Sequence, residues 1–599
     1  MKYVYLILLS LVLGGCASAP PRPTSVAKND YAATKEYIAK LIQYEMKKHA
    51  IAGVSIALVD DQQVIWSQGF GFADQENKIP ATADTLYRVG SISKLFTATT
   101  AMQLVEQGKL DIDQPLKTYI PKFSIKSRYP NSTQITPRTL MTHHSGLPRD
   151  RLKGFFTSHP TPFTKLVDEI QDDYSAYPPN QIFSYSNLGV TLLGNAIQNQ
   201  SGMPFADYMR QSLLAPLGMK HSSFESGLSA STLMAKGYRG LEPEIETPLR
   251  DVPAGGLNSS VNDLSHFISM MFAGGVANNQ QIIQAKTLAE MLRPQNTAVA
   301  LDFDSRIGLG WLLNTGGIPA LKNAGTVAGH SGATILFRSQ LLILPEHKLG
   351  VVVLSNSSTA GNVVSYIGNQ ALALALEAKA GIRAPKAKPA KTHPDKIPLT
   401  PAEISAIVGD YTTFIGPAQV RACGDGLCAH AANRNFDLIR DDDGLFRLHY
   451  SLLGVFPINL GVLGQAGLSK RVVAGRDVLV ARIGDKELLA GQRIEPSSSL
   501  GVWKKRLGKY EIVNLGNDFQ FVKRIRLIEE HGFLRIELTY AAAEEEEEAQ
   551  GIVSLLPVSD TEAVLLGTLN DGGATLRVVM VNGEEYAQFT GYQFKKIAQ

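Results

Sequence analysis

The sequence is short of cysteine, of net charge and of long apolar runs, and each shortage excludes a class of protein. Three cysteines in 599 residues cannot hold together a disulfide-rich scaffold, and no second ligand pair stands near them to build a zinc site. A net charge of only +3 at pH 7 gives no reason to expect nucleic acid as a partner. Beyond the N-terminus, no run is apolar for long enough to cross a bilayer. With 44% hydrophobic and 19% charged residues, the chain has a globular composition and the length of about two to four domains.

The N-terminal residues predict export. Lys2 is followed by an apolar run at residues 3–13, too short for a membrane-spanning helix, and then by small residues that end at Cys16. This is the pattern of a secretory signal peptide. Leu13-Gly14-Gly15-Cys16 resembles the bacterial lipobox, in which the cysteine is acylated and begins the mature protein. The alternative is an ordinary signal peptide cleaved around Ala19.

The lipobox resemblance implies a signal peptide at residues 1–15 and a flexible lipoprotein tether at residues 16–30. Lipidation at Cys16 would attach the protein to the periplasmic face of a bacterial membrane. Ala17, rather than an aspartate, follows the cysteine. By resemblance to lipoproteins, this favours the outer membrane over the inner.

One short stretch, Gly90-Ser91-Ile92-Ser93-Lys94, combines a nucleophile with a group that can activate it. A serine hydroxyl needs a neighbouring base to become a good nucleophile. Apolar residues recur at helical spacing after Ser91, so we expect this serine in the first turn of a mostly buried helix, at the positive end of the helix dipole. Lys94 would then lie on the same face, one turn on. Taken alone, the pattern also fits a capping serine followed by a surface lysine.

Strand-like runs lie on both sides of a long helical stretch. Two, at residues 54–59 and 64–69, precede Ser91, and two more, at residues 335–344 and 349–354, follow it. A sheet assembled from both ends of a segment predicts an α/β sandwich, in which an antiparallel sheet is flanked by helices. The helical insertion would cover the sheet, and a cleft would lie between the two.

A tyrosine and an asparagine are candidates for that cleft. Tyr185 and Asn187 are two residues apart, so in an extended segment they point to the same side. A tyrosine near a lysine ammonium can have its phenol pKa lowered and act as a general base or proton shuttle, while the amide can hold a substrate carbonyl. The alternative is a helix N-terminus capped by Ser186 or Asn187, with Tyr185 packed beside it.

The next cluster is Gly329-His330-Ser331-Gly332-Ala333, which opens a strand-like run over residues 334–344. Glycines at a strand edge let a substrate backbone approach closely. The backbone N–H of Ala333, with that of Ser91, could form a two-donor oxyanion hole. His330 alone also fits a structural or surface histidine.

Ser-x-x-Lys, Tyr-x-Asn and His-x-Gly, in this order and at these separations, resemble the penicillin-binding-protein-like serine hydrolases. This group includes class C β-lactamases, D-stereospecific peptidases and related esterases. The resemblance covers roughly residues 31–375 and extends to four framing stretches: Tyr87-Arg88-Val89-Gly90, Leu140-Met141-Thr142-His143-His144-Ser145-Gly146-Leu147-Pro148, Leu214-Ala215-Pro216-Leu217-Gly218-Met219 and Pro253-Ala254-Gly255-Gly256-Leu257. It implies the α/β fold of β-lactamases and DD-peptidases for a domain at residues 31–378.

The resemblance also implies a mechanism and its residues. Ser91 would form an acyl-enzyme, with Lys94 and Tyr185 sharing the proton transfers and the amides of Ser91 and Ala333 holding the oxyanion. Asn187 would position the substrate amide and the side chain of Lys94, and His330 and Gly332 would line the substrate site. No cofactor or metal is required, and the neighbouring histidines at positions 143 and 144 belong to the framing text.

One position departs from the family's pattern. Class C β-lactamases carry Lys-Thr-Gly where this sequence has His330-Ser331-Gly332. A largely neutral imidazole therefore replaces a fixed cation, and recognition of a carboxylate should be weaker. This favours a peptidase, amidase or esterase over a β-lactamase.

The composition changes after residue 378. Lysines and prolines at residues 379–401 are typical of an extended linker. Residues 402–497 and 498–599 are rich in short strand-like runs. Each contains a Gly-x-Tyr stretch near its start, Gly409-Asp410-Tyr411 in the first and Gly508-Lys509-Tyr510 in the second. This match indicates a repeat of small β-domains.

The two β-domains resemble the lipocalin-like domains appended to some members of this hydrolase family. Cys423 and Cys428 flank a Gly-Asp-Gly turn, so a disulfide-clipped hairpin is expected in an oxidising periplasm. Residues 544–548 are all glutamate, which predicts a solvated loop, with a calcium site as the alternative. We expect these domains to narrow the cleft or to bind a partner.

The sequence thus predicts a lipid-anchored periplasmic serine hydrolase that acts on a small peptide, amide or ester, with fragments of peptidoglycan or D-amino-acid peptides as natural candidates. Two alternatives stay open. One is a class C-like β-lactamase, and the other is a penicillin-binding or sensor lipoprotein that acylates without turnover. Its expected partners are a small-molecule or peptide substrate and the membrane.

Overall fold

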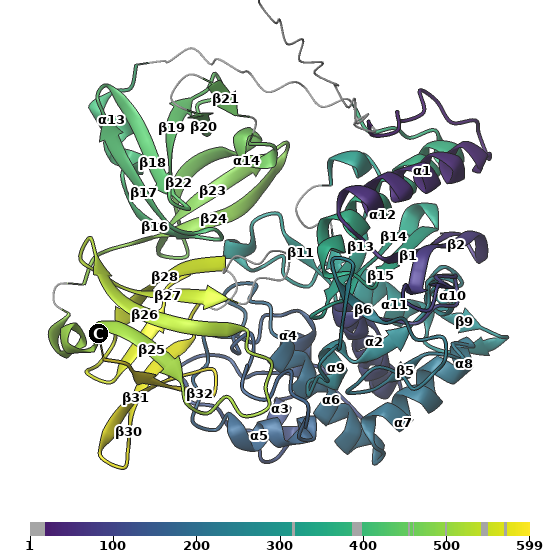
Figure 1. Cartoon of the computed structure of the whole chain (residues 1–599), viewed down its shortest axis with the longest axis horizontal. Helices are drawn as coiled ribbons and strands as arrows, with labels where there is room; N and C mark the ends of the chain where they lie inside the picture. Colours follow the sequence, from purple (N-terminus) through teal and green to yellow (C-terminus); the bar gives the residue numbers. More distant parts are fainter. Residues whose placement is uncertain are drawn as a thin grey trace, which may run out of the picture.

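The computed structural model describes residues 18–313, 318–385, 398–452, 456–458, 460–497, 500–540, 549–567 and 572–598. Five predicted features lie wholly or partly outside the described residues: the signal peptide at residues 1–15, the lipidation site Cys16, the first two residues of the tether at residues 16–30, residues 386–397 of the linker and the glutamates at residues 544–548. Three folded parts make up the rest, namely a sheet-and-helix domain and two β-barrels (Figure 1).

The sheet of the first domain takes strands from both ends of that domain. Its order is β11-β12-β13-β14-β15-β1-β2-β3, and neighbouring strands are antiparallel. The pairing of β1 with β15 joins the two ends, with Val54 opposite Ser355. The strands are β1 (Gly53–Asp60), β2 (Gln63–Asp74), β3 (Ile79–Pro80), β11 (Arg306–Ile307), β12 (Leu312–Leu313), β13 (Ala328–Ala333), β14 (Arg338–Leu344) and β15 (Leu349–Ser355). The predicted α/β fold class is confirmed.

The expected strand over residues 334–344 is shorter than predicted, and the Gly-His-Ser-Gly cluster does not open it. His330 and Gly332 belong to a separate strand, β13, and the chain turns before β14 begins at Arg338. The amide of Thr334 donates to the carbonyl of Phe337 across that turn. The cluster therefore lies inside the sheet, beside the start of the Ser91 helix.

Each face of the sheet packs on its own set of helices, because side chains alternate along the strands. Along β1, Ile56 and Leu58 enter one core, whereas Ala57 and Val59 enter the other. The first core is covered by α1 (Ala32–Lys48) and α12 (Gly361–Ala380). The second is covered by the insertion, whose helices are α2 (Ser93–Glu106), α3 (Leu116–Tyr119), α4 (Pro137–Met141), α5 (Leu166–Glu169), α6 (Asn187–Ser201), α7 (Phe205–Met209), α8 (Ala215–Leu217), α9 (Val252–Gly255), α10 (Val261–Phe272) and α11 (Ala285–Leu292).

Two antiparallel barrels follow. The first barrel closes through the pairing of β19 with β20, and β21 extends it at that edge. Its elements are α13 (Pro401–Ile407), β16 (Gly409–Thr413), β17 (Gly416–Cys423), β18 (Gly426–Ala431), β19 (Arg434–Arg440), β20 (Phe446–Leu452), β21 (Phe456–Ile458), α14 (Val462–Gln465), β22 (Gly467–Val473), β23 (Arg476–Ile483) and β24 (Lys486–Ile494). Cys423 and Cys428 form a disulfide across the hairpin of β17 and β18.

The second barrel closes through the pairing of β25 with β32. Its strands are β25 (Gly508–Ile512), β26 (Val522–Glu530), β27 (Phe533–Tyr540), β28 (Ala549–Pro557), β29 (Glu562–Leu565), β30 (Thr575–Val581), β31 (Glu584–Phe589) and β32 (Tyr592–Lys596). Both barrels have interiors packed with buried side chains. Two closed all-β barrels agree with the predicted lipocalin-like domains.

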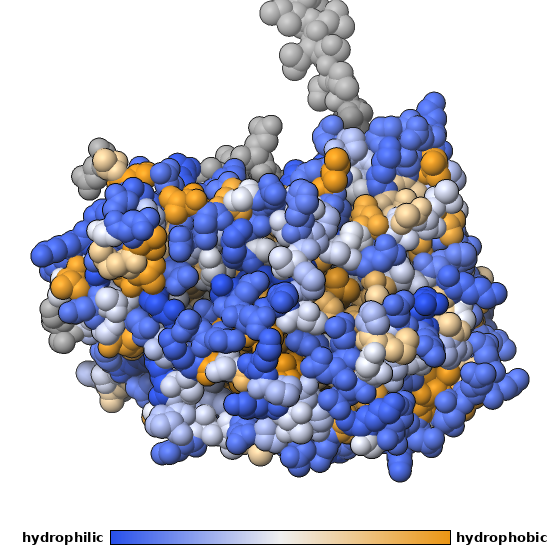
Figure 2. Space-filling model, turned by 90° about the horizontal axis from the view of Figure 1, so that it is seen from below, coloured by the Kyte–Doolittle hydropathy of each residue, from blue (hydrophilic) through white to orange (hydrophobic). Residues whose placement is uncertain are grey.

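On the face of the molecule shown in Figure 2, the surface is mostly hydrophilic, and hydrophobic residues lie in small separate groups. Among the described residues, no helix is long and apolar enough to cross a membrane. The apolar side chains are used instead in the cores of the domain and of the barrels.

Candidate active site

Ser91 lies at the start of α2, where a 3₁₀ turn over Gly90–Ile92 leads into the helix. The ammonium nitrogen Nζ of Lys94 is 2.9 Å from Ser91 Oγ. Lys94 is 1% exposed. The expected arrangement, with the lysine one turn on and on the same face as the serine, is the one that the structure shows.

Tyr185 completes a three-residue cluster. Its hydroxyl Oη donates to Ser91 Oγ at 3.0 Å, and its ring lies 5.1 Å from Lys94 Nζ. Ser186 caps α6, because its Oγ accepts from the amide of Gly189. The alternative for this stretch, a helix capped by Ser186, is therefore correct for the backbone. Tyr185 also hydrogen-bonds to Ser91, as the catalytic interpretation requires.

Asn187 has a different partner from the one expected. It is the first residue of α6 rather than part of an extended segment, and its Nδ2 donates to Asp150 Oδ1 at 2.8 Å. Within the described residues its side-chain amide hydrogen-bonds to Asp150 and not to Lys94, and its expected role at the substrate amide stays a prediction. Asn187 thus positions the carboxylate of Asp150, which in turn faces the lysine.

Burial sets the protonation of Lys94. The pKa of Lys94 is lowered from 10.5 to about 7; desolvation is the largest cause, Arg149 also lowers the pKa, and Asp150 and Asp251 raise it. A buried ammonium loses its hydration, so the neutral amine is favoured. At neutral pH a large fraction of Lys94 is therefore an amine with a lone pair close to the serine hydroxyl.

The pKa of Tyr185 is shifted in the direction opposite to our expectation. We expected the neighbouring lysine to lower it, but burial of the phenol raises it above the ordinary value. Desolvation outweighs the hydrogen bond to Ser91 and the charge of Arg149, both of which lower it. Tyr185 is therefore a neutral phenol, a proton donor, while Lys94 is the group that can accept a proton.

The strand β13 lies directly against the turn that carries Ser91. Gly90 has φ +53°, and a Cβ there would stand 2.8 Å from the backbone nitrogen of Ala333. This places the amide of Ala333 beside Ser91, as the predicted oxyanion hole requires. A Cβ on Gly332 would lie 2.0 Å from the carbonyl oxygen of Val89. The missing side chain at Gly332 thus makes room for the nucleophile turn, and its expected role in substrate binding stays a prediction.

His330 points into the same region and is 4% exposed. Its Nδ1 lies 2.6 Å from the carbonyl of Ser331, which fixes the proton on that nitrogen. Burial and the charge of Lys94 lower its pKa to about 3, so the imidazole is neutral at pH 7, as we expected. Its Nε2 is buried and has no hydrogen-bond partner among the described residues. This nitrogen can accept a hydrogen bond from a substrate.

Several contributors were not singled out from the sequence. Ala254, in α9, accepts a hydrogen bond from Lys94 Nζ at 2.7 Å. The hydroxyl of Ser93 donates to the carbonyl of Gly90 and accepts from the amide of Leu257. Ala254 and Leu257 belong to the framing stretch at residues 253–257, so the sequence marked their position but did not reveal what they contact. Asp150 carried no signal of its own.

The two neighbouring histidines have different partners. His143 Nδ1 accepts from the amide of Ser186 at 3.1 Å, and its ring stacks on that of Tyr185 at 4.3 Å. His144 Nε2 is 2.7 Å from Asp302 Oδ2. Among the described residues, no group of three metal-ligating side chains is found.

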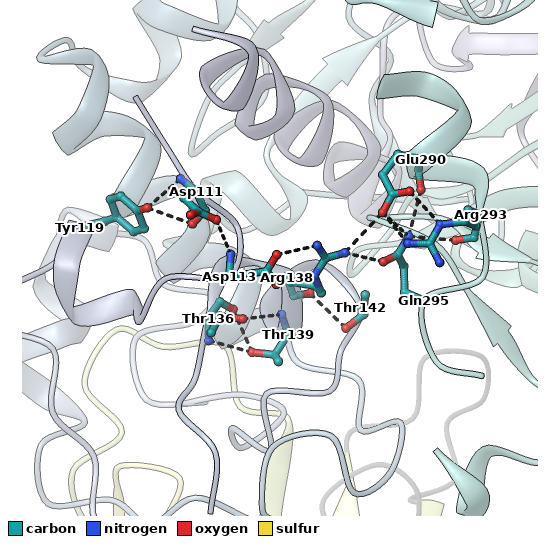
Figure 3. A network of polar contacts seen from close by, with 10 residues as sticks. All are labelled: Asp111, Asp113, Tyr119, Thr136, Arg138, Thr139, Thr142, Glu290, Arg293 and Gln295. Carbon is teal, nitrogen blue, oxygen red and sulfur yellow. Dashed lines mark hydrogen bonds and ion pairs between the residues drawn. The ribbon is translucent and has the colours of Figure 1, made fainter. Parts of the chain in front are cut away.

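A polar network fixes α4, the helix just before these histidines (Figure 3). Arg138 lies between Asp113, at 2.6 and 2.7 Å, and Gln295, at 2.5 Å. Thr136 caps the helix, and its oxygen accepts from the amide of Thr139. These contacts fix the first turn of α4, the short helix that ends two residues before His143.

The fold and this site define the class of penicillin-binding-protein-like serine hydrolases. The family model described as Beta-lactamase matches residues 38–375. This is more than half of the chain, and the protein belongs to that family.

Relatives agree with this membership. The chain is 33% identical over 278 residues to a protein named Beta-lactamase from Providencia stuartii, covering 45% of this chain and 67% of that protein. It is 28% identical to Protein flp of Staphylococcus aureus strain N315, covering 56% of this chain and 66% of that protein, just under two thirds of its length. A crystal structure of SurE with D-Leu shares the fold, with a TM-score of 0.52 and 22% identity over 77% of this chain and all of that one.

Proposed function

We propose that this protein is a serine hydrolase that acylates Ser91 with a small peptide, amide or ester. The observation that carries the proposal is the pair of contacts to Ser91 Oγ, from Lys94 at 2.9 Å and from Tyr185 at 3.0 Å. A serine placed between an amine with a pKa of about 7 and a neutral phenol has both a base and an acid within reach.

The proposed reaction has two halves. Ser91 Oγ attacks the substrate carbonyl carbon while its proton passes to Lys94 Nζ, and the amides of Ser91 and Ala333 hold the oxyanion. A proton from Lys94, relayed by Tyr185, goes to the leaving amine or alcohol as its bond to carbon breaks. Water then attacks the acyl-enzyme by the same route and restores Ser91.

The charge of the site supports our choice of substrate class. The position that carries a lysine in class C β-lactamases carries His330 here, and that imidazole is neutral and buried. We therefore propose peptides, amides or esters ahead of β-lactams, with D-amino-acid peptides of cell-wall origin as natural candidates. A class C-like β-lactamase is the second candidate, and the relative from Providencia stuartii supports it.

Intact-protein mass spectrometry tests the proposal on the soluble chain that lacks residues 1–16. The protein is exposed to a fluorophosphonate and, separately, to penicillin, with Ser91→Ala as the control. We expect one phosphonate adduct that is lost in Ser91→Ala, with little penicillin adduct. A long-lived penicillin adduct would favour a penicillin-binding sensor, and rapid hydrolysis of nitrocefin would favour the β-lactamase. No adduct from either reagent on folded protein would overturn the hydrolase.

We also propose that the protein is a lipoprotein on the periplasmic face of a bacterial membrane, preferably the outer one. The lipobox-like stretch that ends at Cys16 supports this. Fractionation of cells that express the full chain or Cys16→Ser tests it, because only the former should be found with the outer membrane. Equal distribution of both would contradict the lipid anchor.

A further inference from the structure

A short segment of the hydrolase domain connects the active site with the second barrel. We name Arg149–Gly154 the bridging segment. At one end, the carbonyl of Arg149 accepts from the amides of Asn187 and Leu188, and Asp150 accepts from Asn187 Nδ2. Arg149 also lies 5.2 Å from the ring of Tyr185. This end of the segment is thus part of the catalytic site.

The other end of the bridging segment is held by the second barrel. Leu152 packs against the hydrophobic core of that barrel. The amide of Lys153 donates to the carbonyl of Thr590. Asp518 accepts from Lys153 Nζ at 2.9 Å and from the amide of Gly154 at 2.8 Å. Tyr592 Oη donates to the same carboxylate at 3.1 Å.

Asp518 is therefore an anchor with three donors. Its side chain is 3% exposed, and a buried carboxylate needs such donors to stay charged. The loop around it also sends Phe519 and Phe521 against the core of the hydrolase domain. The barrel and the domain thus exchange side chains at this contact.

The bridging segment is also linked to α9, the helix whose Ala254 carbonyl accepts a hydrogen bond from Lys94. Arg250 Nη1 donates to the carbonyl of Lys153 at 2.8 Å, and its Nη2 donates to that of Arg151 at 2.9 Å. The same guanidinium pairs with Asp251 at 2.7 Å, with both side chains almost fully buried. Asp251 stands immediately before α9, whose Ala254 carbonyl accepts from Lys94.

From these contacts we infer that Asp518 of the second barrel is a positioning residue of the active site, which holds the bridging segment so that Asp150, Asp251 and Ala254 lie correctly around Lys94. The inference rests on the proposed acyl-enzyme chemistry at Ser91. It assigns to the barrel a part in catalysis that is exerted through Asp518 and not through contact with substrate.

The charges around Lys94 give this inference a measurable signature. Asp150 and Arg149 come from the bridging segment and Asp251 from the start of α9, while Tyr185, His143 and His330 face the lysine from the other elements. Burial is the largest cause of the low pKa of Lys94. Loosening the bridging segment admits water beside the lysine, which raises that pKa and moves the acid limb of the pH profile to higher pH.

The test measures the rate at which a fluorophosphonate labels Ser91 in the full mature chain across the neutral pH range. Asp518→Ala should label about tenfold more slowly or worse, since misplacing reacting groups by a fraction of an ångström has effects of this size. Its acid limb should lie at higher pH. The labelling rate of Asp518→Asn should lie between those of the unaltered protein and Asp518→Ala. Its amide oxygen still accepts from the amide of Gly154, but it carries no charge to pair with Lys153.

Glu562→Ala is the matched control. Glu562 also lies on the second barrel and pairs with a residue of the hydrolase domain, Arg128, at 2.9 Å, but it does not touch the bridging segment. It should change the rate about twofold at most, because a partly exposed pair contributes little. Thermal unfolding of every variant checks the fold.

The outcomes separate the inference from the proposed function. Absence of labelling in the unaltered protein would sink the function itself. Normal labelling of Asp518→Ala, with an unmoved acid limb, would overturn the inference alone. Equal decreases of the labelling rate in Asp518→Ala and Glu562→Ala would also overturn it. The effect would then come from weaker packing of the second barrel on the hydrolase domain, and not from Asp518 itself. If Asp518→Ala does not fold, Asp518→Asn and Lys153→Met decide by the same two readouts.

Discussion

The two barrels are built alike but attached to the hydrolase domain in different ways. In each, the tyrosine of the first strand donates to the carbonyl four residues earlier, Tyr411 to Ile407 and Tyr510 to Arg506, both at 2.6 Å. The first barrel touches the domain with an outer face, where Val478 and Val480 pack near Tyr177. The second barrel takes Leu152 against its own core. The first barrel thus packs on the domain through the outside of its wall, whereas the second receives a side chain of the domain against its core.

The largest effect should follow from emptying the core of each barrel. Trp503 is 1% exposed in the second barrel and Leu438 is 3% exposed in the first. Trp503→Ala and Leu438→Ala should each lower the free energy of unfolding by about 3 kcal/mol or more. Only Trp503→Ala should also slow labelling of Ser91. Calorimetry and the phosphonate assay would measure the two effects, and equal loss of labelling in both variants would abolish the distinction.

The next effect is confined to the first barrel. Replacing Cys423 and Cys428 by serine removes the disulfide of its β17–β18 hairpin. Closing so short a loop is worth about 2 kcal/mol in the chain-entropy model. We expect the first barrel to unfold at a lower temperature while the labelling rate of Ser91 is unchanged. A slower rate would show that the first barrel also takes part in the site.

The pH profile should distinguish the barrels further. With the pKa of Lys94 at about 7, the neutral amine is lost as the pH falls below 7, and kcat/KM should drop about tenfold for each pH unit below it. Because burial raises the pKa of Tyr185, no loss of activity from that phenol is expected at moderately alkaline pH. Stopped-flow assays of an ester substrate would give the profile. The double serine variant of the first barrel should have the same acid limb, and a shift there would contradict the assignment.

The smallest effect uses the matched tyrosines. Tyr411→Phe and Tyr510→Phe each remove one hydrogen bond to a backbone carbonyl, at a cost of about 1 kcal/mol of stability. The two losses should be equal in chemical denaturation. If the labelling rates of Ser91 differ, the rate should be higher in Tyr411→Phe than in Tyr510→Phe. The reverse order would contradict the inference that the second barrel, and not the first, supports the active site.

Local patterns carried the sequence predictions that the structure agrees with. Ser91 and Lys94 are three residues apart, so helical spacing alone brings them together, and the apolar, β-branched runs that became β1 and β15 predicted the sheet. Asp150, Asp251 and Asp518 could not be found in this way, because the contacts that assemble their surroundings join residues 37, 97 and 365 positions apart and follow no local spacing. The pKa of Tyr185 was expected to shift in the wrong direction for a related reason. A neighbour in the sequence suggests a charge, but only the packed structure shows how much water has been removed.

The contact between Leu152 and the second barrel also has a consequence for the order in which the protein is made. The hydroxyl oxygen of Tyr592 lies 3.3 Å from the carbonyl oxygen of Leu152, across 440 positions of the chain. The sheet and helices of the hydrolase domain can form early in synthesis, but residues 149–154 reach their final place only after β32 has been synthesised. On the inference drawn from Asp518, the surroundings of Lys94 are fully held only once this strand is in place.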